Sequence, residues 1–350
     1  MKYREENFMR RCFDLARLGA GQVSPNPMVG AVIVHHDRVI GEGWHRRYGT
    51  AHAEVNAVNS VRPADLSLLP ESVMYVSLEP CCIFGKTPPC TDLIIKHKIP
   101  HVVISCLDAT PEVAGSGVRK LEAAGVRVKV GVLRAEGEQL AAVRNTFAGK
   151  NRPYIILKYA QSADGYIGRE EEQIWLTNPY AKRLAHKWRS ETDAILVGTN
   201  TAAVDNPRLD NRLWSGDSPL RLVIDRQMRL PQDLYLFNDR QPTLIFTESQ
   251  VSVEGFERTR FITLDFAEDI PLQITETLAR GKVTSLLIEG GAHTLQSFAE
   301  AGLWDEARIF TVKKRLNGGI PAPRLVGNTV KNFALADDNL TVLNRIPANR

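Results

Sequence analysis

The spacing of one histidine and two cysteines constrains this chain most: His52, Cys81 and Cys90. Zinc prefers these ligand types, and three of them leave the fourth tetrahedral position open, as in catalytic zinc sites. Glu54 stands two residues after the histidine, where a carboxylate can handle the protons of a zinc-activated water. His-x-Glu followed by Pro-Cys and a second cysteine is typical of zinc-dependent base deaminases. The fold must therefore bring together residues that lie far apart in the sequence.

The cysteine spacing is a variant of the usual one, because eight residues separate Cys81 from Cys90 instead of two. Either Cys81 or Cys82 can supply the first thiolate, and the Pro-Cys order favours Cys81. Helices are expected to begin at His52 and at Pro88, where a missing proline N–H costs nothing. Helix N-termini directed at one metal would also favour anionic ligands.

Apolar strands alternate with helices through the first part of the chain. Strands are expected at 29–34, 38–42, 73–77, 101–105 and 126–130. Further helices are expected at 8–18 and 117–124. Continuously apolar strands must be covered on both faces, so the pattern predicts an α/β sandwich. The zinc motifs fall at strand-to-helix junctions, where such folds place their ligand sites.

A second α/β domain is expected after a polar, glycine- and proline-bearing linker at 148–153. Its strands are expected at 154–158, 194–198, 220–225, 243–246 and 285–289. Its helices are expected at 178–189, 271–280 and 294–301. The predicted domains are residues 1–148 and residues 149–350.

Length and charge narrow the class of protein. A chain of 350 residues suits two domains, and a net charge of +4 without a basic run argues against a nucleic-acid partner. No apolar run approaches the roughly 18–20 residues of a membrane span, and the first residues lack the apolar core of a signal peptide. An odd count of five cysteines with metal-type spacing argues against a disulfide framework and favours the cytoplasm.

The quoted motifs, with Asn26-Pro27-Met28-Val29-Gly30 and Gly85-Lys86-Thr87-Pro88-Pro89-Cys90, resemble the bifunctional deaminase/reductase of riboflavin biosynthesis. The resemblance implies a cytidine-deaminase-like first domain acting on a diamino-pyrimidinone ribosylamino phosphate. It implies that His52, Cys81 and Cys90 hold zinc, that Glu54 moves protons, and that Asn26 and Lys86 contact substrate. The family has Ser-His after the first cysteine, where this chain has Cys82-Ile83.

Taken alone, the strongest motif of the second half is Ile288-Glu289-Gly290-Gly291, which is either a phosphate-binding turn or a tight strand-to-helix connection. No Gly-x-Gly-x-x-Gly is present. Motifs such as Trp175-Leu176-Thr177 and Asp205-Asn206-Pro207 resemble the reductase half of the same family, which implies a dihydrofolate-reductase-like fold using NADPH. The resemblance implies coenzyme contacts at Ala160, Trp175, Thr201, Asp205, Arg226, Gly291, Ala292, His293, Thr294, Leu295, Gln296 and Ser297. It implies substrate contacts at Gln173, Arg189, Leu209, Arg212 and Glu289.

The expected mechanism has two steps. Zinc hydroxide adds to the amine-bearing ring carbon, Glu54 protonates the ring and the leaving group, and ammonia departs. Hydride then moves from NADPH to C1 of the sugar, and the cofactor supplies the redox chemistry. Lys158, Asp205 and Glu289 are candidate proton donors in the second step. The expected partner is a small phosphorylated pyrimidine, and a homo-oligomer is expected.

Two alternatives stay open. The first is a different zinc deaminase, acting on a nucleoside or on tRNA adenosine, fused to an unrelated reductase. A tRNA enzyme is expected to carry a basic stripe, against which the near-neutral charge argues. The second is a reductase alone, with Cys82 closing a structural zinc site as its fourth ligand.

Overall fold

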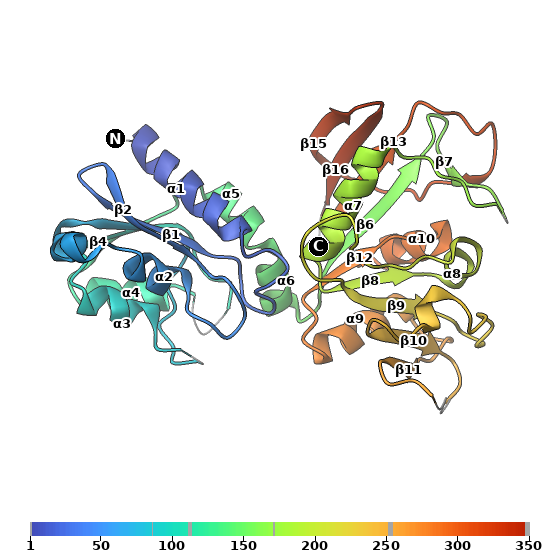
Figure 1. Ribbon diagram of the computed structural model, residues 1–350, viewed down its shortest axis with the longest axis horizontal. Helices are drawn as coiled ribbons and strands as arrows, with labels where there is room; N and C mark the ends of the chain where they lie inside the picture. The colour runs from blue at the N-terminus through green and yellow to red at the C-terminus, as the bar shows by residue number, and fades with distance from the viewer. Residues whose placement is uncertain (1, 86, 111–113, 171, 251–254, 347–350) are drawn as a thin grey trace. The chain divides into compact units, whose positions relative to one another are not determined.

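The computed structural model describes residues 2–85, 87–110, 114–170, 172–250 and 255–346. The chain divides into two units, Met1–Arg152 and Pro153–Arg350 (Figure 1). Among the described residues, no helix combines the length and the apolar character that crossing a bilayer requires.

The first unit is built on a mixed sheet with the strand order β2-β1-β3-β4-β5. Its strands are β1 (Gly30–His35), β2 (Arg38–Trp44), β3 (Val73–Leu78), β4 (His101–Cys106) and β5 (Arg127–Val130). β1 is antiparallel to β2 and β3, whereas β3, β4 and β5 run parallel. The five strands expected in this half are confirmed, with small shifts at their ends.

Helices cover both faces of this sheet. On one face lie α1 (Lys2–Arg17) and α5 (Arg134–Leu140), and on the other lie α2 (Ala53–Asn59), α3 (Cys90–Lys96) and α4 (Ser116–Ala123). Successive strand residues point to opposite faces. Val32 and Val34 accordingly belong to the core beneath α1, while Ala31 and Ile33 belong to the core beneath α2. The predicted α/β sandwich is confirmed.

The predicted linker is wrong in its first half. Ala148, Gly149 and Lys150 are the last residues of a helix, α6 (Ala142–Lys150). The helix ends at Asn151, which adopts a left-handed conformation with φ of 49°. Small polar residues such as Asn tolerate that conformation, so the chain can leave the helix there.

The second unit has a sheet with the strand order β11-β10-β9-β8-β12-β6-β13-β16-β15. The strands run parallel from β11 to β13, and β16 pairs antiparallel with both β13 and β15. The expected strands are confirmed as β6 (Tyr154–Gln161), β8 (Ala194–Val197), β9 (Leu220–Ile224), β10 (Thr243–Thr247) and β12 (Ser285–Ile288). Each was placed within a few residues of its observed bounds.

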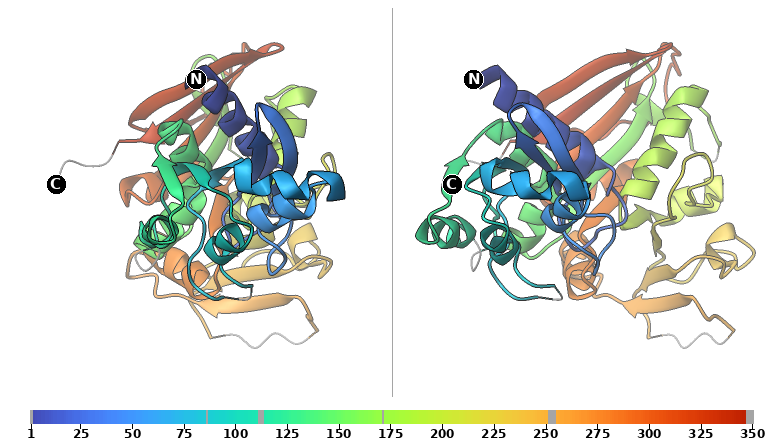
Figure 2. Two further views of the ribbon diagram at one scale, coloured as in Figure 1. Left: turned by 90° about the vertical axis from the view of Figure 1, so that its left-hand side faces the viewer. Right: turned by 60° about the vertical axis from the view of Figure 1, so that its left-hand side comes forward.

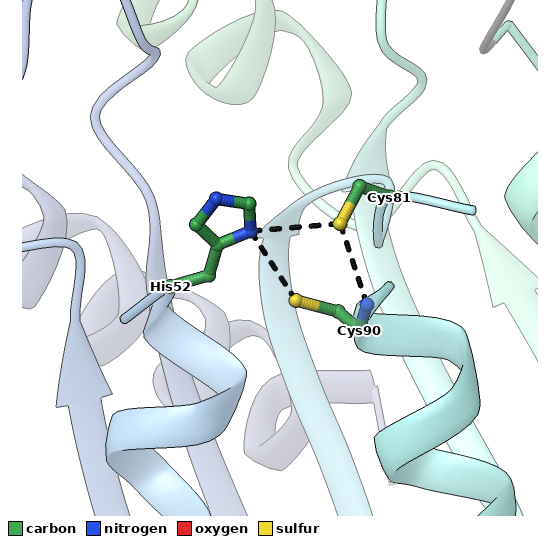
Figure 3. Close-up of side chains that lie close together, drawn as sticks. All are labelled: His52, Cys81 and Cys90. Carbon is green, nitrogen blue, oxygen red and sulfur yellow. Dashed lines mark hydrogen bonds between the residues drawn. The ribbon is translucent and has the colours of Figure 1, made fainter. Parts of the chain in front are cut away.

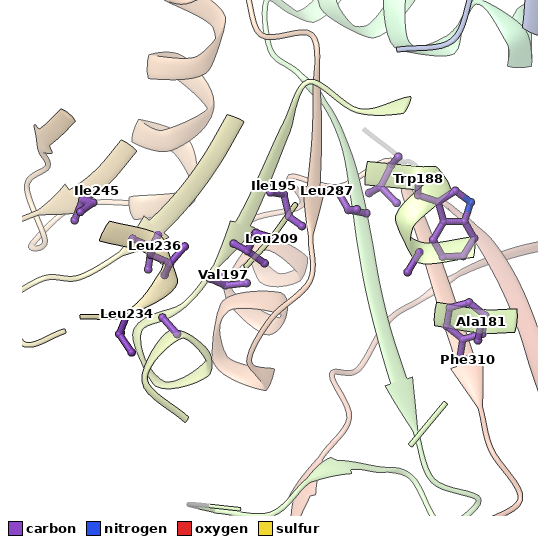
Figure 4. Close-up of a cluster of buried hydrophobic side chains, with 14 of the residues drawn as sticks. Ala181, Trp188, Ile195, Val197, Leu209, Leu234, Leu236, Ile245, Leu287 and Phe310 are labelled. Carbon is purple, nitrogen blue, oxygen red and sulfur yellow. The ribbon is translucent and has the colours of Figure 1, made fainter. Parts of the chain in front are cut away.

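Two helix pairs cover the second sheet. One face packs against α7 (Pro179–Glu191) and α8 (Thr199–Asp205), and the other packs against α9 (Ile270–Arg280) and α10 (Ala292–Glu300). Figure 4 shows the first of these cores, with Ile195, Val197 and Leu287 from the sheet and Trp188 from α7. The parallel strands end at one edge of the sheet, which is where α/β folds bind ligands.

Several elements were not expected from the sequence. They are η1 (Pro63–Glu71), β7 (Tyr166–Gly168), η2 (Tyr235–Phe237), β11 (Thr259–Thr263), β13 (Glu306–Thr311), β14 (Ile320–Pro321), β15 (Gly327–Leu335) and β16 (Asp338–Arg345), together with α5, α6 and α8. Figure 2 shows the β15–β16 pair in red, at one edge of the second sheet. The Asp205-Asn206-Pro207 motif follows a helix, because α8 lies between β8 and Asn206.

Candidate functional site

The first site gathers one histidine and two thiols from three separate segments (Figure 3). His52 is the N-cap of α2, Cys81 follows the end of β3, and Cys90 is the first residue of α3. His52 Nδ1 lies 3.5 Å from Cys81 Sγ and 3.4 Å from Cys90 Sγ. One donor atom of each residue lies within 4.8 Å of the others.

These separations fit a tetrahedral zinc ion. Zinc–sulfur bonds of about 2.3 Å and zinc–nitrogen bonds of about 2.0–2.1 Å at tetrahedral angles place sulfur and nitrogen about 3.6 Å apart. The two nitrogen–sulfur separations here are 3.5 and 3.4 Å. His52, Cys81 and Cys90 are therefore spaced to hold zinc, and one position would be left for water or substrate.

Hydrogen bonds from side chains and backbone prepare Cys81 for ionisation. The N–H of Cys90, at the start of α3, donates to Cys81 Sγ over 3.3 Å. The N–H of Thr91 donates to the carbonyl oxygen of Cys81 over 3.2 Å, which fixes the loop on the helix start. Hydrogen bonding from the Cys90 thiol is the largest cause that lowers the pKa of Cys81 to about 4, and His52 and the Cys90 N–H lower it further. The thiolate that a zinc ligand must be is thus the favoured form at neutral pH.

Glu54 is buried at the same place. It is the second residue of α2 and only 3% exposed, and it shares a hydrogen bond with the Cys90 thiol. Burial, together with the negative charge of Cys81, raises the pKa of Glu54 to about 7. A carboxyl group with a pKa near the working pH both takes up and releases protons, as general acid–base catalysis requires.

Asn26 is held by a histidine that the sequence analysis missed. Its amide nitrogen lies 3.1 Å from His45 Nε2, and His45 Nδ1 lies 3.1 Å from the carbonyl oxygen of Ala51. Burial lowers the pKa of His45, so the ring is neutral, with Nδ1–H donating to Ala51 and Nε2 accepting from Asn26. The ring also lies edge-on to His52, with centroids 5.3 Å apart. No sequence motif marks His45.

Cys82 is not part of the donor group. Among the described residues, the ligand atoms gathered here belong to His52, Cys81 and Cys90, and Cys82 is half-buried outside them. Ile83 and Phe84, which follow it, are exposed. Lys86, expected to contact substrate, lies outside the described residues.

The second unit carries a buried cluster of charges at the end of β12. Glu289 accepts two hydrogen bonds of 2.8 Å from Arg189, and Lys158 Nζ lies 3.6 Å from the same carboxylate. Burial by itself would raise the pKa of Glu289, but the charges of Arg189 and Lys158 hold it at about 2. Two cations facing one anion leave a net positive charge, which suits an anionic or hydroxyl-bearing substrate.

A buried histidine supports this cluster. His186, on α7, accepts the backbone N–H of Arg212 at its Nδ1 over 3.3 Å. Burial and the nearby Arg189 and Arg212 charges lower the pKa of His186 to about 4, so the ring stays neutral. The side chain of Arg212 pairs with Asp210, whose carbonyl oxygen accepts from Arg189 over 3.1 Å. The sequence analysis missed His186, which carries no motif.

Three of the expected coenzyme residues meet where β8 and β12 end. A Cβ on Gly291 would lie 3.2 Å from Thr201 Oγ1, and a Cβ on Gly198 would lie 2.4 Å from Thr294 Oγ1. Gly291 has φ of 63° and precedes α10. Its lack of a side chain leaves the N-terminus of α10 open, and helix N-termini bind phosphate.

Other expected coenzyme and substrate residues lie elsewhere or face inward. Leu209 and Leu295 are buried in the two cores, and Ala160 packs against the first of them. Gln296 bonds Glu300, the Ser297 hydroxyl donates within α10, and Gln173 donates to the carbonyl oxygen of Asp205. His293 is exposed, and Ala292 opens α10. Trp175 is exposed with Lys182 over its ring.

Arg226 is already paired. Its guanidinium donates hydrogen bonds of 2.8 and 2.7 Å to the two carboxylate oxygens of Glu248. Arg226 follows β9 and Glu248 follows β10, and these strands are neighbours in the sheet. A coenzyme phosphate approaching Arg226 would therefore meet a carboxylate as well.

Known proteins resemble this chain along its whole length. Residues 2–106 match the family model of the cytidine and deoxycytidylate deaminase zinc-binding region, and residues 153–343 match that of the RibD C-terminal domain. The riboflavin biosynthesis protein RibD of Bacillus amyloliquefaciens is 38% identical over 351 aligned residues, which cover 98% of this chain and 91% of that protein. The RibD protein of Escherichia coli is 32% identical, over 89% of this chain and 88% of that protein.

A solved structure has a similar fold over nearly the whole chain. The diaminohydroxyphosphoribosylaminopyrimidine deaminase/5-amino-6-(5-phosphoribosylamino)uracil reductase of Thermotoga maritima is 33% identical. It covers 99% of both chains with a TM-score of 0.89.

Proposed function

The chain belongs to the RibD family of riboflavin biosynthesis proteins, and we propose that its units catalyse the deamination and the reduction for which the Thermotoga maritima relative is named. The chain is a bifunctional enzyme with a deaminase domain followed by a reductase domain. The resemblance stated from the motifs is confirmed, and so is the predicted fold class, a cytidine-deaminase-like unit followed by a dihydrofolate-reductase-like unit.

The first unit is proposed to deaminate 2,5-diamino-6-ribosylamino-4(3H)-pyrimidinone 5′-phosphate. The observation that carries this proposal is Glu54, buried beside three zinc-type ligands with a pKa of about 7. Zinc held by His52, Cys81 and Cys90 would lower the pKa of a water molecule to near neutrality. Glu54 would take a proton from the attacking water and deliver it to the ring nitrogen. It would then move the proton of the added hydroxyl group to the departing amine, so that water and substrate become the ring carbonyl and ammonia.

The surroundings of Glu54 suit a proton carrier. Its carboxyl group is shielded from bulk water, because Glu54 is only 3% exposed. Asn26 is held by the neutral ring of His45, which lies beside His52, and is proposed to orient the substrate. A side chain fixed in this way loses little entropy when it binds.

The second unit is proposed to reduce the ribosyl group to a ribityl chain with NADPH. The coenzyme would supply a hydride for C1 of the sugar as the bond from C1 to the ring oxygen breaks, and a proton must reach that oxygen. The substrate is proposed to bind at the charged cluster of Arg189, Lys158 and Glu289. Of its two cations, Lys158 is the one that can release a proton, because arginine stays charged. Thr201, Gly291 and Thr294 are proposed to receive the coenzyme phosphates at the start of α10.

The reductase-only alternative gains no support from the geometry. It requires Cys82 as a fourth ligand, and within the described part of the chain Cys82 stands outside the group formed by His52, Cys81 and Cys90. An open ligand set is typical of catalytic zinc.

The test separates the two activities. Purified, zinc-loaded protein is incubated with the diamino-pyrimidinone substrate without NADPH, and ammonia is measured beside Glu54→Gln. We expect ammonia from the wild type and a loss of about 10²–10⁴-fold in the variant, because a general acid–base group contributes that much. Both proteins should oxidise NADPH equally when given the deaminated substrate. Ammonia release that survives in Glu54→Gln would contradict the assigned role, and none from the wild type would contradict the deamination.

A further inference from the structure

A second cluster of potential metal ligands lies at the tip of the β1–β2 hairpin. His35 is the last residue of β1, and His36 and Asp37 form the turn before Arg38. Adjacent strand residues normally point to opposite faces of a sheet. Here His36 and Asp37 adopt positive φ angles of 43° and 67°, as in the tight turns of hairpins. The two imidazole rings consequently meet, with centroids 4.2 Å apart.

A carboxylate completes the cluster. Glu71 is the last residue of η1 and comes just before β3, whose Val73 pairs with Val34 of β1. Its Oε2 lies 3.6 Å from His35 Nε2. One ring nitrogen of each histidine and one oxygen of Glu71 all lie within 4.8 Å of one another.

One ring nitrogen of His35 is left without a hydrogen bond within the described part of the chain. Its Nε2 atom is buried, and no hydrogen-bond partner for it exists among the described residues. A buried polar nitrogen without a partner is unfavourable, because it has lost its hydrogen bonds to water. The separation of 3.6 Å from Glu71 is longer than a hydrogen bond. It is close to the roughly 3.3–3.5 Å that separates two ligand atoms around a tetrahedral ion with bonds of about 2.0–2.2 Å.

We propose that His35, His36 and Glu71 bind a second divalent transition-metal ion, of the zinc, nickel or cobalt type. Two imidazoles and one carboxylate form a borderline ligand set that suits these ions better than magnesium or calcium. His36 and Glu71 are exposed, so a rotation of each side chain brings its donor atom into place around the buried His35 nitrogen.

Neighbouring charges do not oppose a cation there. Arg38 donates two hydrogen bonds, of 3.1 and 2.7 Å, to Asp65, and Arg4 is paired with Asp37. Arg38 and Arg4 thus each have a carboxylate of their own, and the charge of Glu71 remains to attract a metal ion.

This cluster is separate from the catalytic one. β1 and β3 run antiparallel, and the His35 end of β1 lies beside Val73, the first residue of β3. Cys81 follows the opposite end of β3. The second ion would therefore take no part in the chemistry. It would tie the hairpin to the segment that leads into β3, and so stabilise the folded unit by binding it but not the unfolded chain.

Metal binding by the full-length protein tests the proposal. After the thiolate site is filled with zinc and excess metal is removed, Ni²⁺ is titrated and binding is followed by calorimetry. We expect one further equivalent in the wild type, and no such equivalent in His36→Ala or Glu71→Gln at concentrations that saturate the wild type. His97→Ala, which changes a histidine outside both clusters, should bind like the wild type.

Two further readouts separate this site from the first. Co²⁺ bound at the second site should lack the intense sulfur-to-metal absorption that thiolate ligands produce, and Ni²⁺ should raise the thermal midpoint of the wild type but not of Glu71→Gln. Both variants change exposed residues, so folded protein is expected, and ammonia release reports it. A wild type that binds no further equivalent overturns the proposal, as does undiminished binding by His36→Ala and Glu71→Gln.

Discussion

The backbone N–H of Cys90 donates a hydrogen bond of 3.3 Å to the sulfur of Cys81. Because Cys90 opens α3, the partial positive charge of a helix N-terminus faces this sulfur and favours its thiolate form. Thr91 also holds the carbonyl oxygen of Cys81 through its backbone and its hydroxyl. These contacts distinguish Cys81 from its neighbour Cys82.

Cys81→Ser should therefore lose zinc, and Cys82→Ser should keep it. The first change removes a thiolate from the ligand set, whereas the second alters a thiol outside that set. Zinc content per chain, measured after gel filtration with a mild chelator, checks this. Ammonia release should disappear with Cys81→Ser and persist with Cys82→Ser. Zinc lost from Cys82→Ser instead would restore the closed structural site as the better interpretation.

Glu248→Gln should improve the use of NADPH without changing that of NADH. Glu248 accepts from Nε and one terminal nitrogen along one edge of the Arg226 guanidinium, so it competes with a 2′-phosphate and repels it. Exposed ion pairs are weak, so we expect the KM for NADPH to fall only about two- to fivefold. Arg226→Gln should raise the same KM, and Glu276→Gln, an exposed carboxylate on α9, serves as the control. Equal effects on NADPH and NADH would show that Arg226 does not face the 2′-phosphate.

Gly198→Ala should destabilise the second unit and impair the reductase alone. The added methyl group would lie 2.4 Å from Thr294 Oγ1, which is too close for any real contact. Overpacking of this kind costs about 1–3 kcal/mol in the free energy of unfolding. Thermal unfolding and the KM for NADPH measure the effect, while ammonia release should not change.

Two variants control for the Gly198 prediction. Gly168→Ala adds a methyl group with no heavy atom within 4 Å, so it should unfold like the wild type. Thr294→Ala, combined with Gly198→Ala, removes the obstructing oxygen and should recover part of the lost stability. A double variant as unstable as the single one would place the strain elsewhere.

His186 should make stability depend on pH in mildly acidic solution. The pKa of His186 is about 4 in the folded protein, compared with about 6.5 for an unperturbed histidine. Between these values the unfolded chain binds a proton that the folded protein does not. Stability therefore falls as the pH decreases from about 6.5 to about 4, and this contribution changes no further below that range.

His186→Asn should flatten that pH dependence. Asparagine does not titrate, and its Oδ1 can still accept the N–H that His186 Nδ1 accepts from Arg212. Thermal midpoints at about pH 7 and about pH 4.5 measure the difference. His97→Asn, at the end of α3, should retain the wild-type dependence. An unchanged slope in His186→Asn would show that other groups cause it.

Continuous apolar runs were enough to predict most of the buried strands and the helices between them. β15 was not predicted, because most of its residues are exposed and its sequence therefore carries no apolar run. α8 was not predicted because it is short and ends at Asp205, the first residue of the Asp205-Asn206-Pro207 motif. Glycine and proline predict a linker at 148–153. Gly149 nevertheless lies in α6, which continues to Lys150.

By itself, the sequence determined the donor types and their order, because a histidine, a nearby glutamate and two Pro-Cys pairs limit the possible chemistry before any folding. Only the tertiary structure decided that Cys81 lies with His52 and Cys90, that His45 holds Asn26, and that Arg226 is paired with Glu248. The reason is geometric. Strand ends that are neighbours in a sheet come from distant segments, and pairing brings them together without leaving a motif in either segment.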